Sequence, residues 1–193
     1  MDLNRGKGRT TCGAGNGSVY NQCKLQVRLT LAGGLIVTER VSSNLRIFNI
    51  AKRHVGSLLW SQDSELHGAK KKDKCAMFVY DVITEAGLTT PRQKPWFCGY
   101  SPASSSEWGN RRSEVIHACG CFHSVSIPMR GDIVAFPSNH GTTHCGIVTT
   151  GGHFIGTTNK RIVETKMPAH VKRVFWRYTG DVPNTDRLLE KYK

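Results

Sequence analysis

The chain has 193 residues, a length that fits one domain of ordinary size with room for an arm or a tail. Apolar residues make up 38% of the composition, which excludes disorder throughout, and the absence of a long apolar run excludes a membrane-spanning helix. Lysine and arginine outnumber aspartate and glutamate by 27 to 14, and the net charge of +13 favours an anionic partner such as nucleic acid, anionic lipid or the bacterial wall.

The first 40 residues are predicted to form a basic arm. Residues 1–22 are rich in Gly, Thr, Ser and Asn and offer little for a core to bury. The stretch 29–37 follows basic residues and has the composition of a short signal-peptide core, but it lies far from the start of the chain, so a strand is favoured. We expect the domain over residues 41–180, followed by a charged tail over 181–193.

Two helices are predicted at the start of the domain. From Ser43 apolar residues recur at three- and four-residue spacing, a serine can cap the first turn, and Gly56 is expected to end the helix. The second helix is predicted over 74–86, with Cys75 in its first turn and Gly87 as the C-cap. Its buried sides are expected to consist of Ala76, Met77, Val79, Tyr80, Val82 and Ile83.

Strands are predicted after a long irregular insertion over residues 89–112, which is rich in Pro, Gly and Ser. The expected strands lie within residues 131–137, 144–149, 154–157, 162–165 and 171–178. Helices first and strands afterwards predict an α+β fold, in which N-terminal helices pack on an antiparallel sheet, and not alternating βαβ units.

The seven cysteines suggest that one thiol is spare. In an oxidising compartment six of them could form three disulfide bridges and leave one thiol for chemistry. Cys75 is the candidate, because unpaired N–H groups and the dipole at a helix start stabilise a thiolate, and Lys74 adds positive charge beside it. Taken alone, a cysteine there is more often a buried side chain or half of a disulfide than a nucleophile.

A cysteine nucleophile also needs a base that later protonates the leaving amine, a role suited to histidine. Among the eight histidines, His144 is the best placed, because it heads an apolar strand directly after a polar loop. Its ring could then project from the edge of the sheet toward the helix that carries Cys75.

Three segments together resemble the signature of NlpC-type papain-like cell-wall peptidases: Asp73–Val79, Gly131–Phe136 and His144–Val148. The resemblance covers about residues 43–178. In that family the cysteine that opens the helix is the nucleophile and the histidine that heads the strand is its base, which implies these catalytic roles for Cys75 and His144. No metal or other cofactor is expected.

The Asp-x-Cys start, the long insertion and the compact size are most similar to the second group of amidase effectors of bacterial type VI secretion. The spare thiol is similar to their secreted, domesticated relatives in ticks. The resemblance implies an antibacterial cysteine amidase that cleaves stem-peptide bonds or the D-Ala–diaminopimelate cross-link of peptidoglycan, secreted or delivered to the bacterial periplasm. Peptidoglycan and anionic wall polymers are the expected partners of a monomer, and nucleic acid is not expected.

The chain departs from the family pattern at three places. Ala76 and Met77 follow Cys75 where relatives often have Ser-Gly, a change that helix packing tolerates. Leu58 stands where relatives commonly have tyrosine, so no hydroxyl is available there to assist the oxyanion. The residue that orients the histidine is expected at position 156, which is glycine. Thr158, Asn159 or a backbone carbonyl are the remaining candidates.

Several alternatives stay open. His117, Cys119, Cys121 and His123 are zinc-ligand types, although four alternating residues on one strand would line up along one face, so disulfide bonding is favoured there over zinc. Aromatic residues of the insertion could line a substrate groove or anchor the loop: Trp96, Phe97, Tyr100 and Trp108. As a whole, the chain could instead be a non-catalytic basic module that binds bacterial wall or nucleic acid, or a papain-like acyltransferase or deamidase toxin.

Overall fold

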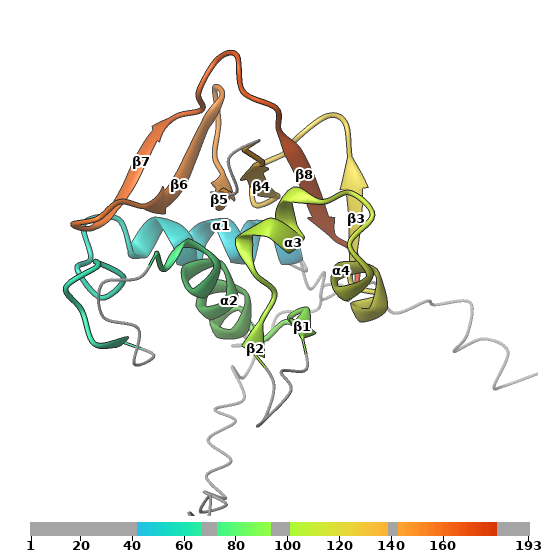
Figure 1. Ribbon diagram of the computed structural model, residues 1–193, viewed down its shortest axis with the longest axis horizontal. Coiled ribbons are helices and arrows are strands. Elements are labelled where there is room, and N and C mark those ends of the chain that lie inside the picture. Colours follow the sequence, from blue (N-terminus) through green and yellow to red (C-terminus); the bar gives the residue numbers. More distant parts are fainter. Residues whose placement is uncertain (1–41, 67–72, 94–100, 139–142, 181–193) are drawn as a thin grey trace, which may run out of the picture.

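The computed structural model describes residues 42–66, 73–93, 101–138 and 143–180 (Figure 1). The described residues form an α+β fold with a six-stranded and a two-stranded antiparallel sheet, so the predicted class is confirmed. The predicted arm, the signal-like stretch and the C-terminal tail lie outside these ranges. No helix in the described ranges is long and apolar enough to cross a membrane.

The helices are α1 (Ser43–Arg53), α2 (Cys75–Glu85), α3 (Ser105–Gly109) and α4 (Glu114–Cys119). The strands are β1 (Arg92–Gln93), β2 (Ser101–Pro102), β3 (Phe122–Val125), β4 (Ile133–Phe136), β5 (His144–Val148), β6 (His153–Thr157), β7 (Ile162–Lys166) and β8 (Val174–Tyr178). The large sheet has the order β3-β8-β4-β5-β6-β7, so β5 is an inner strand with neighbours on both sides. Helices α1 and α2 lie on one side of this sheet (Figure 1).

Helix α1 forms as its sequence predicts, but it ends earlier. The Ser42 hydroxyl accepts a hydrogen bond from the Leu45 N–H, and the apolar spacing buries Ile47 and Ile50. The helix stops at Arg53, three residues before Gly56, where the backbone has φ of 90° and the N–H binds a carbonyl oxygen at the start of β7. The last turn of the predicted helix is therefore not helical, because the Gly56 N–H is hydrogen-bonded to the sheet.

Helix α2 begins at Cys75 and ends at Glu85, with Gly87 at φ of 69° just beyond it. Its buried residues are Cys75, Phe78, Val79, Val82 and Ile83. This spacing is one continuous face, and it packs against α1 and β5. The predicted buried sides were too wide, because Ala76, Met77 and Tyr80 are only partly buried, and Phe78 was missed.

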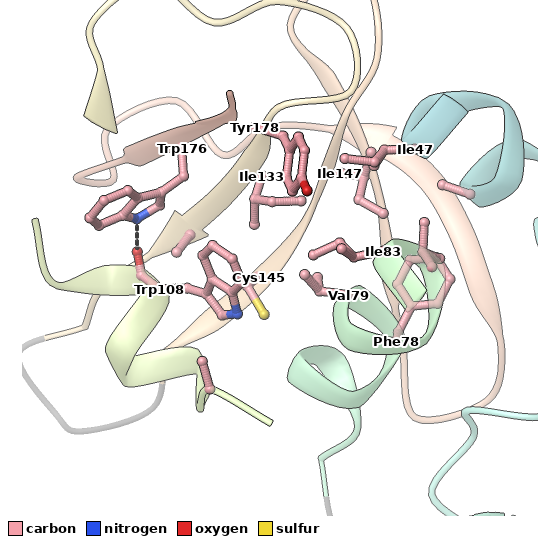
Figure 2. Close-up of a cluster of buried hydrophobic side chains, with 14 of the residues drawn as sticks. Ile47, Phe78, Val79, Ile83, Trp108, Ile133, Cys145, Ile147, Trp176 and Tyr178 are labelled. Atoms are coloured by element: carbon pink, nitrogen blue, oxygen red, sulfur yellow. Dashed lines mark hydrogen bonds between the residues drawn. The ribbon is translucent and has the colours of Figure 1, made fainter. Parts of the chain in front are cut away.

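The two faces of the large sheet contribute to two separate apolar clusters. The face toward the helices contributes Ile133, Cys145, Ile147 and Trp176 to the main core, which also holds the buried face of α2 (Figure 2). The opposite face has a smaller cluster that includes Phe136 and Phe154 from β4 and β6. Alternation along β5 therefore places Cys145 in the main core and His144 on the opposite side.

One aromatic residue of the insertion belongs to the main core. Trp108 in α3 is 2% exposed, and its carbonyl oxygen accepts a hydrogen bond from the Trp176 indole at 2.8 Å (Figure 2). A groove-lining role for Trp108 is therefore wrong, and the anchoring alternative holds for it. The other three insertion aromatics, Trp96, Phe97 and Tyr100, lie outside the described residues.

The histidine–cysteine segment, residues 117–123, was predicted to lie on one strand, and this prediction is wrong. Helix α4 ends at Cys119, Gly120 takes the left-handed conformation with φ of 66°, and β3 begins at Phe122. A C-cap glycine accounts for the break, because only glycine adopts this conformation without strain. His117 and His123 therefore lie on different elements.

Candidate active site

Cys75 opens helix α2 and is almost fully buried against the sheet. Lys74 is the N-cap residue and makes no side-chain capping bond, so the N–H groups of the first turn have no capping side chain. Only 3% of Cys75 is exposed. Its sulfur lies 4.0 Å from the carbonyl oxygen of Thr143, directly before β5, which places the sulfur at the beginning of that strand.

A cavity of about 120 Å³ opens at this point. Its lining comes from separate segments of the chain and consists of Trp60, Gln62, Asp73, Lys74, Cys75, Thr143, His144, Thr157, Thr158 and Asn159. Most of these side chains are polar, with hydroxyl, amide and charged groups around the single sulfur. The cavity therefore brings together both predicted catalytic residues and suits a polar ligand.

The surroundings of the Cys75 sulfur favour its ionised form. A hydrogen bond with the Cys145 thiol has the largest effect, and the pKa of Cys75 falls to about 4 although burial opposes ionisation. The His144 ring lowers the same pKa through a hydrogen bond and through its charge, and the Cys145 backbone contributes a further hydrogen bond. Cys75 is a free thiol, so no disulfide blocks this sulfur as a nucleophile.

Two aromatic rings hold the His144 imidazole from the outer face of the sheet. The Phe136 ring stacks nearly parallel to it, with centroids 6.4 Å apart and an interplanar angle of 14°. The Phe154 ring meets it edge-on at 5.8 Å. Packing between these rings restricts the orientation of the imidazole.

The expected third polar residue is not found at the two predicted side chains. The Thr158 hydroxyl donates to the Arg161 carbonyl oxygen at 2.8 Å and accepts from two N–H groups of the same turn. Asn159 uses its backbone carbonyl to accept the N–H of Gln62 at 2.9 Å. Among the described residues, no hydrogen bond joins either side chain to His144, so Thr158 and Asn159 do not orient the ring.

Position 156 does lie beside the histidine, as the family pattern implies. A Cβ atom built on Gly156 would stand 3.1 Å from His144 Nε2. The Phe154 ring occupies the adjoining space, since the same Cβ would lie 2.8 Å from it, so the structure has no room here for a polar side chain unless that ring moves.

Lys74 does not act as the sequence suggested, as a charge beside the nucleophile. It is 1% exposed, and its ammonium group donates to the carbonyl oxygens of Ser61, at 2.7 Å, and Ser64. The interactions that lower the pKa of Cys75 come from β5 instead. Lys74 anchors the turn that carries Gln62 to the rim of the cavity.

The three-bridge disulfide framework is wrong. Cys75, Cys119, Cys121 and Cys145 are all free thiols, and three bridges would need six of the seven cysteines. Cys12, Cys23 and Cys98 lie outside the described residues. Cys119 and Cys121 also do not form the disulfide that was favoured over zinc for their segment.

The described residues do not form the alternative zinc site either. In the parts of the chain that the structure describes, no three His, Cys, Asp or Glu side chains come together as metal ligands. His117 instead packs edge-on against Trp176, with ring centroids 5.4 Å apart, and Cys121 donates to the Cys119 carbonyl oxygen at 2.8 Å. These residues have structural contacts that account for them.

The influence of Cys145 on the pKa of Cys75 was not predicted from the sequence. The position of Cys145 was readable in principle, because it follows His144 on a strand whose alternate residues must face the helix that carries Cys75. A cysteine within an apolar run is nevertheless indistinguishable by pattern from a small core residue.

The chain matches no protein-family model, no curated protein and no solved structure. The polar cavity that holds Cys75 and His144 and the lowered pKa of Cys75 are therefore the features of the structure that bear on its function.

Proposed function

We propose that this protein is a papain-like, NlpC-type cysteine amidase that cleaves peptide bonds in bacterial peptidoglycan. The observation that supports it best is a buried sulfur with a pKa of about 4, at the start of a helix and in contact with a histidine inside a polar cavity. Perturbed titration of a nucleophile in a cavity is typical of catalytic sites. A structural cysteine in an apolar core is expected to remain a neutral thiol.

The chemistry follows from the positions of the two side chains. The Cys75 thiolate attacks an amide carbonyl carbon, and the unpaired N–H groups at the start of α2 can stabilise the oxyanion that forms. His144 then delivers a proton to the departing amine, which leaves a thioester on Cys75. Water, deprotonated by the same ring, attacks the thioester and releases the acid and the free thiolate.

The polar cavity and the charge of the chain support a wall substrate. Hydroxyl and amide side chains at the rim, including Thr157 and Gln62, suit a polar peptide better than an apolar one. The net charge of +13 attracts the enzyme to anionic wall polymers and stem-peptide carboxylates. The resemblance to cell-wall amidases narrows the proposal to stem-peptide or D-Ala–diaminopimelate bonds, with the protein acting as a secreted or periplasm-delivered monomer.

Digestion of purified sacculi, followed by mass spectrometry of the released muropeptides, tests the proposal. The protein should produce new amine and carboxylate ends at one bond type, and Cys75→Ala should lose at least about 10³-fold of the rate with little change in thermal stability. Cys121→Ala is the matched control, because it removes another buried sulfur from the same core outside the cavity. Muropeptides that stay unchanged after digestion with folded protein would refute the assignment.

A non-catalytic wall-binding module is the second candidate, and the net charge of +13 is the observation that favours it. Such a module would bind sacculi with an affinity that falls steeply with salt, equally for the parent and Cys75→Ala, and would cleave nothing. Transfer of an acyl group to a protein, or deamidation of one, would instead point to a toxin on the same scaffold.

A further inference from the structure

The cavity that holds Cys75 and His144 also holds a carboxylate. Asp73 lies two residues before Cys75 and lines the same cavity. Among the described residues around the cavity it is the only carboxylic acid, and most of the others are uncharged. A mechanism that uses only Cys75 and His144 leaves Asp73 without a role.

No cation within the described ranges neutralises this carboxylate. Asp73 accepts one hydrogen bond, from the Gln62 side-chain amide to Oδ1 at 3.1 Å, and makes no ion pair there. The adjacent Lys74 is 1% exposed, and its ammonium group donates to the carbonyl oxygens of Ser61 and Ser64. Lys74 is therefore engaged elsewhere, and the charge of Asp73 is left facing the cavity.

Other acidic side chains of the described residues do have cationic partners. Glu85 pairs with Arg53, and Asp132 pairs with Arg177. The chain has 27 Lys and Arg residues for 14 Asp and Glu residues, so cations are abundant. A carboxylate that lines a cavity without one of them is complementary to a cation that a ligand supplies.

We propose that Asp73 binds an ammonium group of the substrate, so that the enzyme prefers peptides with a free amine close to the scissile bond. The inference rests on the proposed function, because it names the substrate class of the same site.

The charges around the cavity explain why such a group needs Asp73. The net charge of +13 repels a cation at long range, so a cationic group is retained only where a local anion holds it. In the proposed mechanism a thiolate on Cys75 and a proton on His144 offset each other. Asp73 then supplies the negative charge of the cavity, and a carboxylate in a concave site attracts a cation more strongly than one on open surface.

A purely structural role for Asp73 makes a different prediction. If Asp73 only fixes the Gln62 side chain, Asp73→Asn should leave the substrate preference unchanged, because asparagine keeps a carbonyl oxygen that accepts the same hydrogen bond. If the carboxylate binds an ammonium group, the substitution should remove the preference, because it removes the charge and little else.

Digestion of sacculi whose free amines have been chemically modified tests the proposal. Three preparations are compared: untreated sacculi, sacculi acetylated so that the amines lose their charge, and sacculi reductively dimethylated so that the amines keep it. Mass spectrometry of the muropeptides measures the cleavage rate and identifies which amine each treatment has modified. Asp63→Asn is the matched control, because Asp63 is an exposed carboxylate of the neighbouring turn and does not line the cavity.

We expect the parent to cleave acetylated sacculi about tenfold more slowly than untreated sacculi, as for the loss of one hydrogen bond to a charged group. Dimethylated sacculi should be cleaved at a rate similar to that of untreated ones. Asp73→Asn, folded by circular dichroism, should cleave all three at the slow rate, and Asp63→Asn should behave as the parent does.

Equal rates of the parent on acetylated and untreated sacculi would overturn the ammonium site and leave the proposed function standing. The same conclusion would follow if Asp73→Asn kept the parent's preference, since another group would then cause it. A parent that cleaves none of the three preparations would overturn both.

Discussion

At the scale of single residues, Gly156 sets how closely β6 approaches His144, the proposed catalytic histidine. It pairs with Gly146 across the β5–β6 ladder, so two glycines face each other beside the His144 ring. A Cβ atom at position 156 would lie 2.8 Å from Phe154 Cε2 and 3.1 Å from His144 Nε2. Both contacts are with side chains, which can give way only by moving the imidazole or the ring that packs against it.

We therefore expect Gly156→Ala to lower the rate of the proposed amidase reaction by about tenfold or more, because a displacement of a fraction of an ångström disturbs the reacting geometry. Thermal stability should fall only slightly. Gly146→Ala is the contrasting variant, because it should lower thermal stability more than Gly156→Ala does. Its Cβ would lie 2.4 Å from the Ile155 carbonyl oxygen, a backbone atom that can move only if the strand moves with it. If Gly156→Ala retains the full rate, the ring position is not critical.

The meeting of Cys75 and His144 in one cavity could be predicted from sequence, because their positions depend on local features, a helix start and the head of a strand. The group that orients His144 could not be predicted. Thr158 is a plausible candidate in the sequence, and only the structure shows that its hydroxyl is hydrogen-bonded to Arg161 within its own turn. Lys74 was also unpredictable. A lysine is rarely buried, and its two carbonyl partners belong to a turn ten or more residues away.

At the scale of elements, the turn over residues 61–64 is held to the start of α2 by the buried Lys74 ammonium. The same turn positions Gln62, whose side chain donates to Asp73 at 3.1 Å and whose N–H donates to Asn159 at 2.9 Å. One wall of the cavity is thus fixed by hydrogen bonds between loops.

Lys74→Met should lower the free energy of unfolding by about 2–4 kcal/mol, because two buried carbonyl oxygens lose a charged donor. Urea denaturation measures this change. We also expect a larger KM for a soluble stem peptide, since the wall that carries Gln62 loosens. A loss of stability of less than about 0.5 kcal/mol would show that water replaces the ammonium group at both oxygens.

The turn before β4 is fastened to β8 in a similar way. The Asp132 carboxylate is fully buried and accepts hydrogen bonds from Arg177 Nε and Nη2, at 3.0 and 2.9 Å, and from the Met129 N–H at 2.7 Å. The paired carboxylate also raises the pKa of the Arg177 guanidinium. This ion pair links the strand after the turn to its neighbour in the sheet.

Asp132→Ala should lower the free energy of unfolding by about 3 kcal/mol, since it leaves a partly buried guanidinium without its partner. The double variant Asp132→Ala/Arg177→Met should be less destabilised than the sum of the two single variants, which urea denaturation of all four proteins can measure. Additive effects would mean that the pair is not energetically coupled.

Helices α1 and α2 and strands β4 to β8 could be predicted because apolar periodicity and caps are local signals. Helix α4 and β3 were missed for a physical reason. Alternating His and Cys residues have the period of a strand, and a single glycine in the left-handed conformation turns the second half of that pattern onto a new element.

At the scale of the whole molecule, the fold does not depend on the three-bridge framework that the cysteine count suggested. Of the four free thiols, Cys75 lines the cavity and Cys145 lies in the main core. Cys119 ends α4, and Cys121 lies between α4 and β3. The burial of a continuous core replaces covalent bracing in the described residues.

Ellman titration of the protein, purified without reductant and unfolded in guanidinium, should accordingly find at least four free thiols of seven. In the native state Cys119 should react more slowly than Cys75, because burial and the neighbouring Cys121 raise its pKa to about 12. Fewer than four thiols after unfolding would contradict the free state of these cysteines.

The neighbouring positions of His144 and Cys145 have a consequence for how the site can change by insertion or deletion. A register shift of one residue in the pairing of β5 would exchange the two faces of the strand. The His144 imidazole would then point into the apolar core, and the Cys145 thiol would lie between the phenyl rings of the opposite face. Such a slip would disable both the proposed acid–base catalysis and the packing of the core. Length variation should accordingly be tolerated only outside this ladder.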